Sequence, residues 1–279
     1  MKARIKFQKY GAMKFIGHLD IMRYFQKLFR RAEIDNEYSK GFSPHQIMSF
    51  AAPLGVGLTS DGEYLDVQLL SSDESSVMIE RMNAAATEGL HITGFWPLLD
   101  PIENQRVITA MSLVASADYL VSLKDGYSLG DIGSQKEFKE LFETFLAQTE
   151  IIIDKKTKNS EKAVDIKPMV SLAAFDKQEY ERKLAELKQP ITSISRTNPI
   201  KGHALLTESV ADSYESGILA FLQVDTGSAA NLKPELVMEA FCQYRNIPYE
   251  KFAWQVHRLE VYTRDADSGK VIPLDCLER

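Results

Sequence analysis

The sequence predicts an α+β protein with two domains. Short segments in which polar and apolar residues alternate indicate strands, and segments between them with a period of about 3.6 residues indicate helices. A chain of 279 residues with 44% hydrophobic residues exceeds the usual size of one domain and can bury a substantial core. Both periods break at residues 98–107, so we expect one domain at residues 1–98 and another at residues 108–279.

The first domain is expected to contain four strands and two helices in the order βαββαβ. The strands are residues 4–8, 46–50, 63–69 and 91–95, and the helices are residues 19–32 and 75–87. The first strand is expected to be half-buried because its polar and apolar residues alternate. Ser71, Ser72 and Asp73 supply an N-cap for the second helix, whose inward residues are Val77, Ile79, Met82 and Ala86. This order is typical of a ferredoxin-like domain, in which two helices cover one face of an antiparallel sheet.

The second domain is expected to be a related α+β unit. Its predicted elements are strands at residues 111–123, 218–224 and 253–262, helices at 134–147 and 233–245, and a hairpin of 150–154 with 163–169. Residues 175–217 do not fit either period. We expect them to be an insertion with one polar helix and a long loop.

Composition indicates the cellular location of the protein and bears on whether it holds a metal or cofactor. No run of about 18 apolar residues is present, and the N-terminal cations Lys2, Arg4 and Lys6 precede no apolar signal segment. We therefore expect a cytoplasmic protein without a membrane span. Cys242 and Cys276 give neither zinc nor iron–sulfur spacing, so no metal or cofactor is expected.

Charge is divided unevenly along the chain. Residues 1–60 contain ten lysines and arginines against four acidic residues, a net charge of +6, whereas the other 219 residues carry 23 against 35, a net charge of -12. Such segregation favours a polyanionic or acidic partner for the basic part. The alternative is that the basic part packs against acidic residues of the same chain.

The helix at residues 19–32 is expected to have a core face and a cationic face. The core face consists of Ile21, Phe25, Leu28, Phe29 and Ala32, and the cationic face of Arg23, Lys27, Arg30 and Arg31. The spacing of the cations places them within reach of successive phosphates or of an acidic surface. A solvated helix face is the simpler alternative.

Two polar residues stand at the start of this helix. Asp20 lies in the first turn, where a carboxylate complements the helix dipole, so capping alone can explain it. His18 can carry a proton, contact a phosphate or hold a loop in place. A structural, hydrogen-bonded histidine is the alternative for His18.

The segment after the helix combines aromatic, cationic and turn-forming residues. It contains Tyr38, Ser39, Lys40, Gly41, Phe42, Pro44 and His45. Aromatic rings beside a cation suit a contact with single-stranded RNA or a nucleotide, although the same residues can build a turn packed on the core. A second glycine-rich turn adds Glu63, and neither turn has the spacing of a phosphate-binding loop.

The motifs of residues 17–66 resemble those of a known family. GHLDIMRYFQKLFRRAEI, EYSKGFSPH, SFAAPLGVG and GEYLD, in this order, are similar to the motifs of the radical SAM-linked family of unknown function, DUF2344. Gly17 stands where the family usually has Ser, and Gln46 where it has Pro. The resemblance implies a radical SAM protein as partner, since members are fused to such proteins or encoded beside them, and it implies no catalytic residues.

Two functions therefore remain as hypotheses. The first is a non-catalytic accessory or RNA-binding module that works with a radical SAM enzyme in tRNA or ribosomal RNA modification. Its binding residues are His18, Asp20, Arg23, Lys27, Arg30, Arg31, Tyr38, Ser39, Lys40, Gly41, Phe42, Pro44, His45 and Glu63. The second is a metal-independent endoribonuclease with an architecture like that of CRISPR repeat-processing enzymes. It uses His18, His45, Tyr38 and Lys40 as acid, base and charge-stabilising groups.

Overall fold

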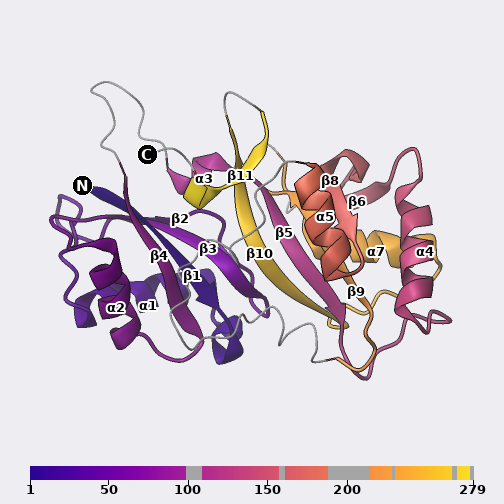
Figure 1. Cartoon of the computed structure of the whole chain (residues 1–279), viewed down its shortest axis with the longest axis horizontal. Helices are drawn as coiled ribbons and strands as arrows, with labels where there is room; N and C mark the ends of the chain where they lie inside the picture. Colours follow the sequence, from indigo (N-terminus) through magenta and orange to yellow (C-terminus); the bar gives the residue numbers. More distant parts are fainter. Residues whose placement is uncertain (99–108, 157–160, 188–213, 228–229, 266–268, 277–279) are drawn as a thin grey trace. The chain divides into compact units, whose positions relative to one another are not determined.

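The protein has a mixed α+β fold, as the sequence predicts. The computed structural model describes residues 1–98, 109–156, 161–187, 214–227, 230–265 and 269–276 (Figure 1). The described residues form two compact units. Unit 1 contains residues 1–115 and those from 258 onward, and unit 2 contains those from 116 to 257. The structure thus groups the C-terminal residues with unit 1, which the predicted boundaries of 1–98 and 108–279 did not anticipate.

Unit 1 contains all six elements predicted for the N-terminal part. They are β1 (Lys2–Lys9), α1 (His18–Arg31), β2 (Met48–Phe50), β3 (Thr59–Gln68), α2 (Ser75–Ala85) and β4 (Leu90–Leu98). A 3-10 helix η1 (Gly11–Phe15) precedes α1, and α3 (Ala110–Leu113), β11 (Val271–Pro273) and the 3-10 helix η4 (Leu274–Cys276) complete the unit. β1, β3 and β4 are longer than predicted because residues at their ends continue the pairing, whereas β2 is shorter than the predicted 46–50.

The sheet of unit 1 has β1 between β4 and β3. Ile5 is paired with Phe95 of β4 and with Leu65 of β3, and both pairings are antiparallel. β2 pairs with β3 in the same antiparallel manner, and β10 (Trp254–Arg264) is the next strand beyond β3. β1 therefore has a hydrogen-bonded neighbour along each edge.

Helices α1 and α2 cover one face of this sheet, and their contact surface forms the core of unit 1 (Figure 1). Phe25 of α1 packs edge-on against Phe7 of β1 and Phe50 of β2, with ring centroids 4.8 and 5.7 Å apart. All five residues of the predicted core face of α1 are buried. The two-faced character of this helix is confirmed.

The prediction for α2 is confirmed for Met82, which is buried, and for Ile79 and Ala86, which pack partly buried against the core. It is wrong for Val77 and for the cap. Met78 and Met82 are the buried residues, whereas Val77 is 39% exposed. The helix begins at Ser75 after Glu74, which makes no side-chain cap. A helix that begins at Ser75 directs Met78 and Met82, which are one turn apart, toward the sheet. The apolar pattern alone did not distinguish these two residues from their apolar neighbours.

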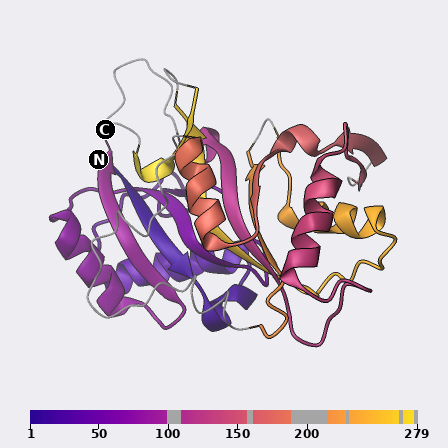
Figure 2. The ribbon, with the colours of Figure 1, turned by 45° about the vertical axis from the view of Figure 1, so that its right-hand side comes forward.

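Unit 2 is built on an antiparallel sheet in the order β5-β9-β8. Its elements are β5 (Val114–Leu123), α4 (Gln135–Leu146), β6 (Ile152–Lys156), β7 (Glu161–Asp165), the 3-10 helix η2 (Lys167–Met169), β8 (Val170–Ala174), α5 (Lys177–Glu186), β9 (Leu219–Asp225) and α7 (Pro234–Tyr244). Helices α4 and α7 lie side by side (Figure 2), with the rings of Phe142 and Phe241 4.9 Å apart. An aromatic core thus joins the two helices.

Two predicted strands of the second half are shorter than expected. Residues 110–113 form α3 instead of the start of β5, because Thr109 and Ser112 make a reciprocal capping box. The second hairpin strand ends at Asp165, and Pro168 in the first turn of η2 favours the 3-10 helix that follows. The expected polar helix of the insertion is α5, and the part of the insertion at 188–213 lies outside the described residues.

None of the helices in the described part of the chain has the length and apolar character of a membrane-spanning helix.

Candidate binding surface

The exposed face of α1 carries the four predicted cations. Arg23, Lys27, Arg30 and Arg31 are all exposed, opposite the buried core face. A helix sorts its residues in this way when apolar positions recur every three or four residues, so the cations are held on a well-packed scaffold. Asp20 is the acidic residue of the first turn, and the N-cap position is occupied by Gly17 without a side-chain cap.

The four cations differ in what they contact. Arg23 donates to Asp20 over 3.0 Å, with both side chains more than 60% exposed, so this pair adds little stability and is easily exchanged. Arg31 donates twice to the carbonyl of Ala85 and lies over the ring of Tyr24. Lys27 and Arg30 make no ion pair with any residue that the structure describes. Arg23, Lys27 and Arg30 are thus available to a ligand, whereas Arg31 also holds α2 in place.

The loop after α1 is closed by a short neck. Tyr38 and Gln46 form an isolated β-bridge, and the Ser39 amide donates to the His45 carbonyl over 2.8 Å. The Ser39 hydroxyl accepts from the His45 amide and lies 2.9 Å from Nδ1 of the same histidine. His45 therefore contributes to the neck of the loop, with its ring on the surface.

The tip of the loop projects into solvent. Lys40, Gly41, Phe42 and Pro44 are exposed, and the ring of Phe42 is uncovered on all sides. Gly41 has a φ of 121°, a conformation that side chains with a Cβ rarely adopt. The neck thus presents one aromatic ring and one cation on a short, closed turn.

A hydrogen bond attaches this loop to the edge of the cationic face. Nε2 of Gln46 donates to the carbonyl of Gln26 in α1 over 3.5 Å and to the hydroxyl of Tyr38 over 3.2 Å. Gln26 lies one turn from both Arg23 and Arg30. We use "cationic surface" for Arg23, Lys27 and Arg30 together with Tyr38, Lys40, Phe42 and His45 of the loop.

His18 lies in a different environment from His45. Its ring is partly buried and packs edge-on against Phe50, with centroids 5.2 Å apart. The described contacts of the two histidines therefore go to different partners, Phe50 for His18 and Ser39 for His45.

Glu63 is buried in unit 1. Its carboxylate accepts from Nη1 of Arg258 over 2.9 and 3.1 Å, and the same nitrogen donates to the carbonyl of Ala52. Burial raises the pKa of Glu63 and outweighs the opposite effect of Arg258. The structure thus gives Glu63 a partner within the unit and does not bring it to the exposed loop.

Sequence reasoning missed a second charged region, the polar side of β1. Nearly every residue of this strand is buried, so the expectation of a half-buried strand is wrong. The apolar residues face α1 and α2, and the alternating polar residues Arg4, Lys6 and Gln8 meet buried partners instead of water. The acidic residues of β3, β10 and η4 were the signal from which these buried ion pairs could have been suspected. Their spacing did not show that they are partners of β1.

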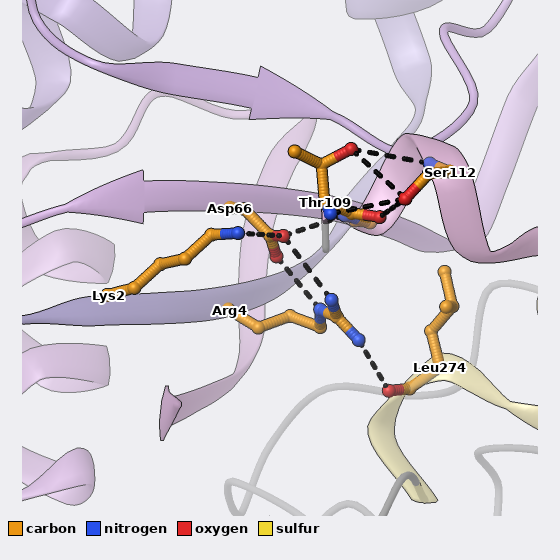
Figure 3. Close-up of polar contacts among 7 residues, drawn as sticks. Lys2, Arg4, Asp66, Thr109, Ser112 and Leu274 are labelled. Carbon is orange, nitrogen blue, oxygen red and sulfur yellow. Dashed lines mark hydrogen bonds and ion pairs between the residues drawn. The ribbon is translucent and has the colours of Figure 1, made fainter. Parts of the chain in front are cut away.

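Asp66 of β3 is the first buried partner (Figure 3). Its carboxylate accepts from Nε and Nη2 of Arg4 over 2.9 and 3.3 Å, and Lys2 lies 3.4 Å away. The Ala110 amide also donates to Asp66, at the start of α3. Nη1 of Arg4 then reaches the carbonyl of Leu274. This cluster therefore links β1 and β3 to α3 and η4 within unit 1.

Lys6 is the centre of the second buried cluster. Its ammonium donates to Glu260 over 2.6 Å and to Asp275 over 3.1 Å, and its side chain is fully buried. The hydroxyl of Tyr64 donates to the other oxygen of Glu260 over 2.7 Å. Burial lowers the pKa of Lys6, but the charges of Glu260 and Asp275 outweigh it, so the pKa lies above its usual value. Lys6 is thus a buried cation paired with two carboxylates inside unit 1.

These contacts divide the basic excess of residues 1–60 into two parts. Arg4 and Lys6 of β1 are buried and paired with acidic residues of the same unit, and Lys9 donates to the carbonyl of Ile16. The cations of α1 and the loop face solvent. The alternative of packing against acidic residues of the same chain therefore holds for Arg4 and Lys6, whereas the cations of α1 remain exposed. Among the described residues, no group of three or more His, Cys, Asp and Glu side chains is arranged to hold a metal ion.

The fold and this surface define a mixed α+β protein with one exposed cationic helix face. Residues 2–199 match the family described as "Uncharacterized protein conserved in bacteria (DUF2344)", so the chain belongs to this family. No curated protein matches the chain.

Proposed function

We propose that unit 1 is a non-catalytic RNA-binding module that works with a radical SAM enzyme in the modification of tRNA or ribosomal RNA. The observation that carries this proposal is the cationic surface. Three exposed cations follow one side of α1, and the adjoining loop presents the ring of Phe42 beside Lys40.

The chemistry of the surface suits RNA better than a small ligand. Lysine and arginine side chains bind phosphates along a strand, and exposed aromatic rings stack on unpaired bases. Arg23, Lys27 and Arg30 supply the first kind of contact, and Phe42 and Tyr38 the second. The three cations are exposed at spacings of four and three residues along one helix, and contacts of this kind to the backbone tolerate different RNA sequences.

The radical SAM partner is proposed from the family motifs alone. EYSKGFSPH is one of the four segments in which the chain resembles radical SAM-linked proteins, and it forms the loop of the cationic surface. A protein that holds RNA beside such an enzyme needs no catalytic group of its own.

A mobility-shift experiment tests RNA binding. The full chain is titrated into a panel of tRNA and ribosomal RNA fragments at about 50 and about 200 mM salt. We expect binding that weakens steeply with salt, and a loss of more than tenfold in affinity for the variant R23E/K27E/R30E. Lys136→Glu, a charge reversal at an 88% exposed position of α4, is the matched control and should bind as the unmodified chain does. Absence of binding, or binding that does not respond to the triple variant, would remove the proposal.

The endoribonuclease is the second candidate. It uses His18, His45, Tyr38 and Lys40, of which the last three belong to one loop. We prefer the binding module because the contacts of His18 lead to Phe50 and not to the loop. Cleavage of RNA by the purified chain that is lost in both His18→Ala and His45→Ala would reverse this preference.

We also propose that unit 1 contains a variant of the ferredoxin-like arrangement, formed by β1, α1, β2, β3, α2 and β4. The antiparallel neighbours β4-β1-β3, with β2 on β3 and both helices over one face, support it. The variant feature is β10, which also lies next to β3.

A further inference from the structure

Three large apolar side chains are exposed near the start of α1. Phe15 of η1 is 67% exposed, Leu19 of α1 is 62% exposed and Val56 of the loop before β3 is 61% exposed. Single exposed apolar residues are common on protein surfaces, whereas clusters of them mark contact sites.

Short contacts bring these three residues to one place. The Gly57 amide donates to the Lys14 carbonyl over 2.7 Å, which ties the Val56 turn to η1. The side chain of Val56 lies over Gly17, where an added Cβ would be 3.7 Å from Cγ2 of Val56. Gly17 stands two residues from both Phe15 and Leu19, so Val56 lies against the short segment that carries them. We call Phe15, Leu19 and Val56 the "apolar cluster".

The base under the apolar cluster is firmly held. Lys9 of β1 donates to the carbonyl of Ile16 over 2.9 Å, and the His18 ring packs on the buried Phe50. The three side chains are thus presented by a fixed backbone, which lowers the entropic cost of binding a partner.

The rim of the apolar cluster is cationic. The ammonium of Lys14 lies 5.2 Å from the centre of the Phe15 ring. Arg23 and Lys27 follow Leu19 at intervals of four residues, so they lie on the same side of α1. Asp20 is the acidic residue at this end of the helix, and Arg23 neutralises it. A partner that covers the apolar cluster therefore meets an excess of positive charge.

We propose that the apolar cluster docks a protein partner through an apolar side chain flanked by acidic residues. Phe15 is the one member of the cluster with an aromatic face on which a base could stack. Leu19 and Val56 are aliphatic and offer none, so the cluster as a whole suits a protein better than RNA. Pairing with a second copy of the chain would place Lys14 and Arg23 opposite like charges. The loop of the cationic surface meets α1 at Gln26, about two helical turns further on. The docking site shares Arg23 and Lys27 with the proposed RNA contact, but its apolar members are not part of the cationic surface. The docking proposal rests on these apolar residues and does not depend on RNA binding.

Site-specific photocrosslinking in cells tests this site. A photoreactive amino acid replaces Leu19 in the full chain, and Val77, an exposed apolar residue of α2, is the matched control position. We expect one protein to be crosslinked at position 19 and not at 77, through a segment in which an apolar residue has acidic neighbours. Crosslinks at position 19 to RNA, to a second copy or to a segment without acidic residues would overturn the proposal, and so would the absence of a crosslink.

Binding of that crosslinked segment as a synthetic peptide gives the quantitative test. We expect the variant L19S/V56S to weaken it by about tenfold or more, as for the central residues of protein interfaces, and Val77→Ser to leave it unchanged. Replacing the acidic residues of the peptide by their amides should weaken binding as well. Equal binding to L19S/V56S would overturn the proposal. RNA affinity of L19S/V56S should remain that of the unmodified chain, so failure of this site and failure of the RNA proposal are distinguished.

Discussion

β1 and α1 follow each other in the chain, and both are rich in cations, but the structure uses these cations in opposite ways. Arg4 and Lys6 of β1 are buried and paired, whereas Lys27 and Arg30 of α1 are exposed. Basic residues in one segment can therefore serve folding or recognition, and the count of charges alone does not separate the two. The number of covered faces of an element shows which of these two purposes its cations serve.

The difference comes from the position of each element in unit 1. β1 is hydrogen-bonded along both edges and covered on both faces, so its buried cations need buried acceptors. Arg4 and Lys6 meet acidic side chains, and Lys9 meets the carbonyl of Ile16. α1 is covered on one face only. Its cations remain in water, where a ligand can replace the solvent.

Lys6→Met is the substitution with the largest expected effect on stability. It leaves Glu260 and Asp275 buried without their cation, and removal of one partner of a buried ion pair costs about 3–5 kcal/mol. Urea unfolding followed by the fluorescence of Trp96, in a Trp254→Phe background, measures the loss in unit 1. A cost below about 1 kcal/mol, as for an exposed pair, would show that Lys6 is not neutralised in the way described.

Asp66→Asn is expected to have a smaller but still large effect. The amide keeps one acceptor for Arg4 but loses the charge that faces Lys2 and Arg4, and an unsatisfied buried group costs about 1–3 kcal/mol. The same fluorescence experiment applies. Asp73→Asn is the control, since Asp73 pairs with Arg81 at the surface, and its cost should stay below about 1 kcal/mol. Equal costs for both variants would contradict the contrast between buried and exposed charge.

Glu179 in unit 2 is an intermediate case, a largely buried carboxylate held by partly exposed lysines. Burial raises its pKa, but hydrogen bonds from Lys183, Lys139 and the Phe175 amide outweigh this and lower the pKa to about 2. The stability that it contributes is therefore complete above its unfolded pKa and is lost as the pH falls toward about 2. In Glu179→Gln, the stability of unit 2 should depend less on pH between about 4 and about 2. Unfolding curves followed by Trp254, in a Trp96→Phe background, measure this, and an unchanged pH profile would count against the three contacts.

Arg30→Ala is expected to have the smallest effect on stability. Arg30 makes no ion pair with the described residues, and surface substitutions of this kind change stability by about 0.5 kcal/mol or less. Urea unfolding of the Arg30→Ala chain beside the Lys6→Met chain measures the contrast directly. A loss of more than about 1 kcal/mol would mean that the exposed face of α1 serves the fold.

Much of the secondary structure could be predicted from the sequence, whereas most contacts between distant residues could not. Periodicity located β1, α1 and α4 to within a few residues, because each has a regular apolar face. It could not show that Lys6 meets Glu260, since the two residues are 254 positions apart and only the folded chain joins them. The contact of Val56 with Gly17 could not be predicted from the sequence either.

For the surface, the sequence indicated the residues but not their contacts. The opposition of Phe25 and Lys27 on α1 could be predicted because helical geometry alone determines it. The closing contacts of Ser39 with His45, and the attachment of Gln46 to α1, depend on the path of the loop. Glu63 was grouped with the loop by its place in a glycine-rich turn, whereas its side chain is directed to Arg258.

The salt dependence of RNA binding tests most directly whether the exposed cations of α1 serve recognition. Each phosphate contact contributes about 0.7–0.9 to the slope of log affinity against log salt concentration. We expect R23Q/K27Q/R30Q to lower the slope by about 2–3, and Lys136→Gln in unit 2 to leave it unchanged. A slope that is the same in all three proteins would contradict the assignment of RNA binding to the exposed face of α1.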